Sequence, residues 1–227
     1  MSSARAPQGR AGRRPAHVLV TAGPTREYVD PVRFLSNESS GRMGFAIARE
    51  AARAGHRVTL VSGPVALETP PGVRRVDVES AREMLAAARA AFRDADAIYM
   101  AAAVADWRPA RRLAGKWRAK DGGRARTSLA LVKNPDILAT LTEAKGDRLV
   151  VAFALETGDG LRRAAVKMRR KRADFVVLND ESSLNAPRTS VIILGSDGSR
   201  VRMANVSKLS VAQALVALLR RRSPRRS

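Results

Sequence analysis

A chain of 227 residues, 45% of them hydrophobic, is large enough for one sizeable α/β domain or for two small ones. The absence of cysteine excludes disulfides, cysteine zinc sites and a thiol nucleophile, and it suits a reducing compartment. No apolar run approaches the roughly 20 residues of a membrane span, and the N-terminus lacks the apolar segment of a signal peptide. We therefore expect a soluble cytoplasmic protein with no membrane partner.

The formal net charge of +21 allows two interpretations. Four arginines lie in residues 1–16 and five in residues 220–227, and the body between these ends is also strongly basic. Such a charge favours either a polyanion such as nucleic acid or phosphate-bearing small substrates. Because aromatic residues make up only 4% of the chain, too few for base-stacking platforms, we do not expect nucleic acid as a partner.

Both ends of the chain predict disorder, since they are polar, basic and without periodicity. Residues 1–16 are expected to be a disordered basic leader and residues 220–227 a disordered basic tail. A single domain is expected over residues 17–219. It opens with a buried strand at 17–22, followed by a polar connection over 23–40, and a connection of that length in a compact domain is usually functional.

The first half continues with helices and strands in alternation. The predicted elements are a helix at 44–54, strands at 57–62 and 73–78, a helix at 80–93 and an all-apolar strand at 97–102. Ser80 is expected to cap its helix, with Glu83 completing a capping box. The apolar strand is expected to be central and parallel.

The second half follows a polar segment over 104–126. Its predicted elements are an edge strand at 127–131, helices at 135–143, 160–172 and 208–219, strands at 149–154 and 174–178, and a hairpin of 190–194 with 200–204. Asn134 is expected to cap the helix that Pro135 begins. The alternation predicts a Rossmann-like, doubly wound, mostly parallel α/β sheet with helices on both faces and a small C-terminal hairpin.

The stretch from Ser36 to Ala48 predicts a turn between a strand and a helix, where anionic ligands bind in open α/β sheets. It holds small and hydrogen-bonding residues that would let a ligand approach the backbone, namely Asn37, Ser39, Ser40, Gly41 and Gly44. The alternative is a helix entry whose glycines serve packing. The preceding polar segment with Thr25, Arg26, Asp30 and Arg33 favours a binding wall, because such residues add little to a core.

A nicotinamide site is not expected. Its glycine fingerprint should follow the first strand directly, whereas Gly41 and Gly44 come roughly twenty residues after Gly23. The acid expected at the end of the second strand is replaced by Ser62 and Gly63.

Other polar clusters have both functional and structural interpretations. Small residues at 101–103 leave room for a base or ribose, and Asp106 could bind a sugar or cap a helix. The basic run at 115–120 is either a solvated loop or a mobile lysine closing on a triphosphate. The helix start at 133–137 favours an anion. Lys167 and Lys171 share one helix face, which is either solvated or a phosphate site.

Seven blocks in order carry a family resemblance. They are Thr21–Glu27, Asp30–Asn37, Ser39–Gly44, Leu60–Pro64, Ala101–Asp106, Val132–Ile137 and Phe153–Thr157. Over about Val18 to Leu219 the chain resembles the phosphopantothenoylcysteine synthetase domain of coenzyme A biosynthesis. The resemblance implies a ligase that joins 4′-phosphopantothenate to L-cysteine. In the bacterial type CTP, with Mg²⁺, activates the carboxylate as an acyl cytidylate with loss of pyrophosphate, and cysteine then displaces CMP.

The resemblance also implies roles for individual residues. Asn37 matches the asparagine that holds the acyl-cytidylate carbonyl, Lys116 the mobile-loop lysine of the first half-reaction, and Arg33 a residue on the phosphopantothenate side. The implied nucleotide-binding positions are Met100, Ala101, Ala102, Asp106, Lys116, Pro135, Asp136, Ile137, Leu138, Phe153, Lys167 and Lys171. No metal ligand is assigned. The family also implies a homodimer.

Two departures qualify the resemblance. Relatives often have Lys-Ile-Lys-Lys in the mobile loop, whereas this chain has Lys116-Trp117-Arg118-Ala119 followed by Lys120. The fused flavin-dependent decarboxylase of most bacterial relatives has no counterpart here, so synthetase activity without flavin is expected. The alternative from another class is a basic module that binds nucleic acid or a membrane surface on a degenerate Rossmann-like fold, which the terminal arginines favour.

Overall fold

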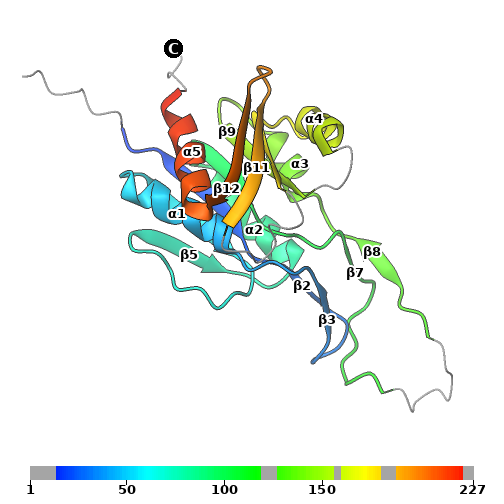
Figure 1. Cartoon of the computed structure of the whole chain (residues 1–227). Coiled ribbons are helices and arrows are strands. Elements are labelled where there is room, and N and C mark those ends of the chain that lie inside the picture. The colour runs from blue at the N-terminus through cyan, green and yellow to red at the C-terminus, as the bar shows by residue number, and fades with distance from the viewer. Residues whose placement is uncertain (1–13, 119–126, 156–159, 180–187, 222–227) are drawn as a thin grey trace, which may run out of the picture.

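The computed structural model describes residues 14–118, 127–155, 160–179 and 188–221 (Figure 1). Within these residues an eight-stranded sheet has the order β12-β11-β10-β9-β6-β1-β4-β5. Its strands are β1 (His17–Ala22), β4 (Arg57–Ser62), β5 (Val73–Asp77), β6 (Ala97–Met100), β9 (Leu149–Leu155), β10 (Phe175–Asn179), β11 (Arg188–Gly195) and β12 (Arg200–Ser207). Pairing is parallel from β5 to β10 and antiparallel for β11 and β12. The predicted fold class is confirmed.

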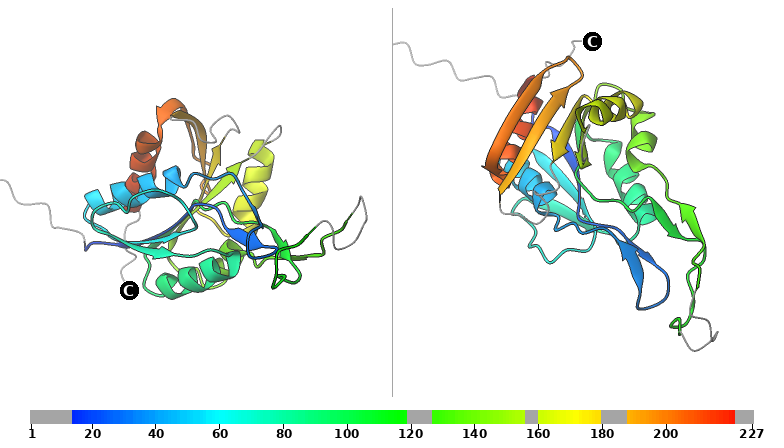
Figure 2. Two further views of the ribbon diagram at one scale, coloured as in Figure 1. Left: turned by 90° about the horizontal axis from the view of Figure 1, so that it is seen from below. Right: turned by 45° about the vertical axis from the view of Figure 1, so that its right-hand side comes forward.

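Helices cover both faces of the sheet (Figures 1 and 2). They are α1 (Arg42–Arg53), α2 (Ala81–Phe92), α3 (Ile137–Thr142), α4 (Gly160–Arg170) and α5 (Lys208–Arg221). Because successive side chains of a strand point to opposite faces, β1 contributes to two cores. Val20 packs with α1 and α5, and Leu19 packs with α2 and α3, all fully or almost fully buried.

Two short antiparallel ribbons extend from the same end of the body (Figure 2). The first pairs β2 (Arg26–Tyr28) with β3 (Phe34–Ser36), and the second pairs β7 (Trp107–Pro109) with β8 (Leu131–Lys133). Strand β2 contacts β7. The ribbons therefore place the segments after β1 and after β6 side by side.

Several predicted elements differ from the structure. The connection over 23–40 contains a hairpin, and the strand expected at 127–131 lies at Leu131–Lys133, where it pairs with β7. Helix α1 begins two residues before the predicted start, and α5 continues to Arg221. Residues 1–13 of the predicted leader, 222–227 of the tail, Ala119, Lys120, Glu156 and Thr157 lie outside the described residues.

The cap of α3 lies two positions after the predicted one. Asp136, not Asn134, is the N-cap, and its carboxylate accepts a hydrogen bond from the backbone N–H of Ala139 at 2.9 Å. Pro135 precedes the cap rather than beginning the helix. By contrast, the Ser80 cap of α2 is confirmed, since its hydroxyl accepts from the N–H of Glu83. No helix in the described part of the chain is long and apolar enough to span a membrane.

Candidate functional site

The segments that follow β1 and β6 lie side by side and are joined by backbone hydrogen bonds. The N–H of Ala103 donates to the carbonyl of Gly23 at 2.9 Å, and the N–H of Thr25 donates to the carbonyl of Ala103 at 3.2 Å. Gly63, after β4, lies so close that an added Cβ would overlap the carbonyl oxygen of Pro24. These contacts hold the carboxyl ends of three neighbouring strands together, which is where ligands bind in such sheets.

The glycines of the predicted anion-binding turn have different roles. An added Cβ on Gly44 would lie 2.5 Å from the Cβ of Ala22, so this glycine permits close packing of α1 on β1. Gly41 is the N-cap of α1, with φ of 73° and no side-chain cap. The packing interpretation therefore holds for Gly44, and Gly41 supplies the left-handed turn into the helix.

The Asn37 side chain lies at the end of the central strand. Its Nδ2 donates to the carbonyl oxygen of Ala103 at 3.2 Å, and the side chain is otherwise exposed. Because Ala103 follows the strand end at 100–102, this contact joins the predicted catalytic asparagine to the predicted nucleotide-binding strand end. The amide oxygen of Asn37 has no hydrogen-bond partner among the described residues, so it can accept a hydrogen bond from a ligand.

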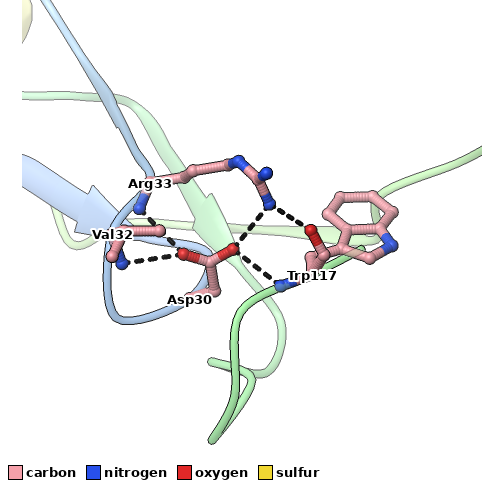
Figure 3. Close-up of polar contacts among 4 residues, drawn as sticks. All are labelled: Asp30, Val32, Arg33 and Trp117. Carbon is pink, nitrogen blue, oxygen red and sulfur yellow. Dashed lines mark hydrogen bonds and ion pairs between the residues drawn. The ribbon is translucent and has the colours of Figure 1, made fainter. Parts of the chain in front are cut away.

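Asp30 anchors the segment that carries Lys116 (Figure 3). Its carboxylate is fully buried and accepts from the N–H groups of Val32 and Arg33, each at 2.8 Å, and from the N–H of Trp117 at 3.0 Å. The Arg33 guanidinium forms an ion pair with the same carboxylate at 2.9 Å and also donates to the carbonyl oxygen of Trp117. Asp30 and Arg33 therefore hold the backbone N–H and the backbone carbonyl of Trp117.

The electrostatics of Asp30 follow from these contacts. Burial alone would raise the pKa of its carboxyl. The backbone N–H donors of Trp117, Val32 and Arg33, together with the Arg33 charge, outweigh burial and lower the pKa below its ordinary value. Asp30 therefore stays ionised as a fixed acceptor.

The expectation that 23–35 contributes little to a core was wrong. Thr25 and Asp30 are fully buried, and the Thr25 hydroxyl accepts from the N–H of Ala105 at 3.0 Å. The Arg26 guanidinium lies over the Phe34 ring at 4.6 Å. Polar side chains can be buried here because they accept hydrogen bonds from backbone N–H groups of the hairpin and of the β6–β7 connection.

A second cluster gathers residues predicted to bind nucleotide. The Lys171 ammonium forms an ion pair with Asp136, and Lys171 is only 6% exposed. Burial lowers the pKa of Lys171, the nearby positive charge of Lys133 lowers it further, and Asp106 opposes both. The sheet order thus brings Asp106, Asp136 and Lys171 together from three separate segments of the chain.

Lys167 lies beside this cluster. Its Nζ donates to the carbonyl oxygen of Phe153 at 2.7 Å, at the carboxyl end of β9. The N–H of Lys171 bonds to the carbonyl of Lys167 at 2.9 Å, which continues the α4 pattern by one residue and keeps both lysines on one side. The predicted shared face is therefore confirmed.

The remaining predicted residues fall into three groups. Met100, Ile137 and Leu138 are buried and support the site, while Ala101, Ala102 and Pro135 are partly exposed near it. Arg33 lies with the Lys116 segment. Lys116 itself is exposed, and within the described residues no hydrogen bond or ion pair joins its side chain to Asn37 or to Lys171.

Sequence reasoning gave Asn134 the wrong role. Its buried side-chain amide donates to the carbonyl of Ala105 at 2.8 Å, and its N–H donates to the carbonyl of Asp106 at 2.8 Å. Asn134 therefore positions the backbone beside Asp106. Asp30 was assigned to a binding wall, although an aspartate before a proline at a turn commonly accepts from N–H groups two and three residues on.

A family model described as the DNA/pantothenate metabolism flavoprotein C-terminal domain matches residues 14–222. The chain belongs to this family. The coenzyme A biosynthesis bifunctional protein CoaBC of Escherichia coli strain K12 is 44% identical over 190 residues, which cover 82% of this chain and 47% of that protein. CoaBC of Bacillus subtilis strain 168 is 39% identical, covering 86% and 49%. The chain thus spans about half the length of the curated relatives it matches.

Solved structures agree with the family. The crystal structure of the C-terminal domain of CoaBC is 38% identical, with a TM-score of 0.78, and the match covers 90% of this chain and 93% of that domain. The chain is therefore homologous to that C-terminal domain. A complex of a Cab2 mutant with phosphopantothenate-cysteine shares the fold, with a TM-score of 0.72 at 19% identity.

Proposed function

We propose that the protein is a phosphopantothenate–cysteine ligase of coenzyme A biosynthesis. The observation that carries the proposal is homology to the CoaBC C-terminal domain over nearly its whole length, and the polar contacts around Asn37 and Lys171 support it. The solved Cab2 complex holds phosphopantothenate-cysteine on the same fold, which supports this product class.

The proposed reaction has two half-reactions. A carboxylate oxygen of 4′-phosphopantothenate attacks the α-phosphorus of CTP, the bond to the β-phosphate bridge breaks, and pyrophosphate leaves. The cysteine amine then attacks the acyl carbon, the bond from that carbon to CMP breaks, and a proton leaves the nitrogen. Activation is needed because a free carboxylate is a poor electrophile.

The two clusters divide these tasks. Lys167 and Lys171 supply positive charge to the triphosphate, and Asp106 accepts hydrogen bonds from the nucleoside. Asn37 holds the acyl-cytidylate carbonyl with its amide. Lys116 is presented on the segment that Asp30 anchors, and Arg33 borders the phosphopantothenate side. In this arrangement the protein orients two anions whose mutual repulsion must be offset.

Mg²⁺ belongs to the proposal as the companion of CTP. Mg²⁺ in nucleotide sites is bound mainly by phosphate oxygens and water, with one or two carboxylates. Among the described residues no group of three or more histidine, cysteine or carboxylate side chains could hold a metal, whereas Asp106 and Asp136 both lie beside Lys171. This sparse donor set fits an ion that arrives with the triphosphate and that phosphate oxygens and water would mainly hold.

A homodimer is proposed from the surface of the ribbons. Large apolar side chains are exposed there, namely Val32 (59%), Phe34 (40%), Trp107 (52%), Leu131 (42%) and Val132 (37%). Because both ribbons extend from one end of the body, these side chains are suited to burial against a second copy (Figure 2). Sedimentation of wild type against Trp107→Ser with Val132→Ser tests it, and a monomeric wild type would refute it.

The decisive assay is pyrophosphate release with CTP and ATP compared side by side. Release should require 4′-phosphopantothenate and Mg²⁺, should favour CTP, and should yield 4′-phosphopantothenoylcysteine when cysteine is added. No release with either nucleotide would overturn the ligase and leave the basic binding module as the better hypothesis. Release that favours ATP would overturn the choice of nucleotide alone.

A further inference from the structure

A shallow pocket of about 580 Å³ lies between α2 and the segment that joins β8 to α3. Four cationic side chains line it: Arg82 and Arg89 from α2, Arg108 from β7 and Lys133 from β8. None of the described residues that line it carries a carboxylate. Leu85, Ala86 and Pro135 provide an apolar wall between the charges.

These cations are not neutralised within the described chain. The Arg108 guanidinium donates to the carbonyl of Lys133 at 2.6 Å and to the amide oxygen of Asn134 at 3.2 Å, and both acceptors are uncharged. No ion pair with a carboxylate joins Arg82, Arg89, Arg108 or Lys133 in the residues that the structure covers. Gathering like charges is unfavourable unless an anion lies between them.

The spacing of the charges suits a phosphate with an organic part. Arg82 and Arg89 are seven residues apart, so they share one face of α2 at about 10.5 Å along its axis. Arginine forks bind phosphate oxygens in pairs, while lysine adds a point charge. The apolar wall lies between the two arginines, where the carbon portion of a ligand would be desolvated.

The pocket is separate from the proposed nucleotide cluster but connected to it. Asp106, Asp136, Lys167 and Lys171 do not line it, although Pro135 borders both. Asn134 lines the pocket through its contact with Arg108, and its own N–H holds the carbonyl of Asp106. Lys133 also acts electrostatically on Lys171.

We propose that this pocket binds a small organic phosphate and that its occupancy changes nucleotide affinity at the neighbouring cluster. An anion here would draw Arg108 away from Asn134 and offset the charge of Lys133, and both changes reach Asp106 and Lys171. Only the coupling half rests on the proposed function, because binding to the pocket does not depend on the ligase reaction.

The binding test uses phenyl phosphate and inorganic phosphate as probes. Backbone amide NMR signals of Leu85 and Ala86 are followed during titration of wild type, of Arg82→Gln with Arg89→Gln, and of Arg49→Gln with Arg200→Gln as a control. The control removes the same charge from exposed positions on α1 and β12. Glutamine has nearly the helix propensity of arginine, so α2 should persist, and far-ultraviolet circular dichroism checks this.

Saturable shifts of both signals with phenyl phosphate are expected in wild type and in the control. The affinity should be about tenfold weaker in the Arg82/Arg89 variant, because charge-assisted hydrogen bonds are lost. Unsaturable shifts, or equal affinity in that variant, would overturn the site. Inorganic phosphate binding as tightly as phenyl phosphate would overturn the organic ligand and assign free phosphate.

The coupling test measures CTP affinity by calorimetry with and without saturating phenyl phosphate. Wild type should show a severalfold change that the Arg82/Arg89 variant lacks. An unchanged CTP affinity would overturn the coupling. If CTP does not bind at all, the nucleotide assignment fails, whereas the NMR titration still decides the pocket, so the two failures are distinguishable.

Discussion

The backbone N–H of Trp117 donates to the carboxylate of Asp30 across 87 positions of sequence, at 3.0 Å. Arg33 completes the contact by bonding to both the carboxylate and the Trp117 carbonyl. A buried anion thus fixes the residue next to Lys116 without using the Lys116 side chain. The Lys116 segment is therefore anchored by the hairpin after β1 rather than by its own neighbours.

Asp30→Asn should loosen this anchor. The amide keeps the size of the carboxyl but loses its charge, the Arg33 ion pair and one acceptor. We expect faster proteolysis near Trp117 and a rate of acyl-cytidylate formation reduced about tenfold, since misplacement of a catalytic group is costly. Mass spectrometry of early tryptic cleavages and single-turnover pyrophosphate release measure the two effects. An unchanged cleavage pattern would show that the anchor is not needed.

Lys116→Gln should slow the first half-reaction. Under the proposed mechanism this change removes a lysine charge from the developing pyrophosphate, and comparable electrostatic groups contribute about 10²–10³ in rate. Rapid-quench measurement of pyrophosphate release gives the rate. Arg118→Gln is the matched control, because Arg118 is exposed in the same segment and should retain a near wild-type rate. If both variants behave alike, Lys116 has no special role.

Asn37→Asp should separate the two half-reactions. Its carboxylate cannot donate to the Ala103 carbonyl or, in the role proposed for Asn37, to the acyl-cytidylate carbonyl, while the proposed nucleotide cluster is untouched. We expect acyl cytidylate to accumulate and cysteine transfer to fall at least about 10²-fold. Trapping the intermediate and quantifying it by mass spectrometry tests this. Loss of the first step would instead place Asn37 in activation.

Gly63→Ala should destabilise the fold. Its Cβ would overlap the carbonyl oxygen of Pro24, so the strand-end segments must move apart. We expect a loss of about 2–4 kcal/mol in the free energy of unfolding, in the range of severe steric changes. Gly115→Ala is the control, because nothing lies within 4 Å of its added Cβ. Urea denaturation of both variants provides the comparison.

Lys171 should make stability depend on pH at the alkaline end. Its folded pKa is lowered from 10.5, mainly by burial, so between the folded pKa and 10.5 the unfolded chain binds more protons than the folded chain. The contribution of Lys171 to the free energy of unfolding therefore rises with pH through this window. Urea denaturation at a series of alkaline pH values below 10.5 should show that rise in wild type and lose it in Lys171→Gln. Arg170→Gln, on the exposed end of α4, should keep it.

The sequence alone determined the fold class and the family. Buried parallel strands are apolar throughout, and amphipathic helices repeat at 3.6 residues, so local periodicity encodes the alternation of elements. Blocks such as Asp30–Asn37 and Val132–Ile137 then carried the family resemblance. Asn37 and Lys171 stay predicted site residues; in the structure Asn37 contacts the carbonyl of Ala103, and Lys171 pairs with Asp136.

Only the tertiary structure decided which polar residues support the site and which remain open to a ligand. Asp30, Thr25 and Asn134 have partners in segments distant in sequence, so no local pattern distinguishes a buried acceptor from a binding wall. The same limit applies to Arg82 and Arg89, which form part of a pocket only because β7 and the start of α3 pack beside α2. Periodicity reports which face of an element is buried, whereas the sheet order determines which neighbours a polar side chain meets.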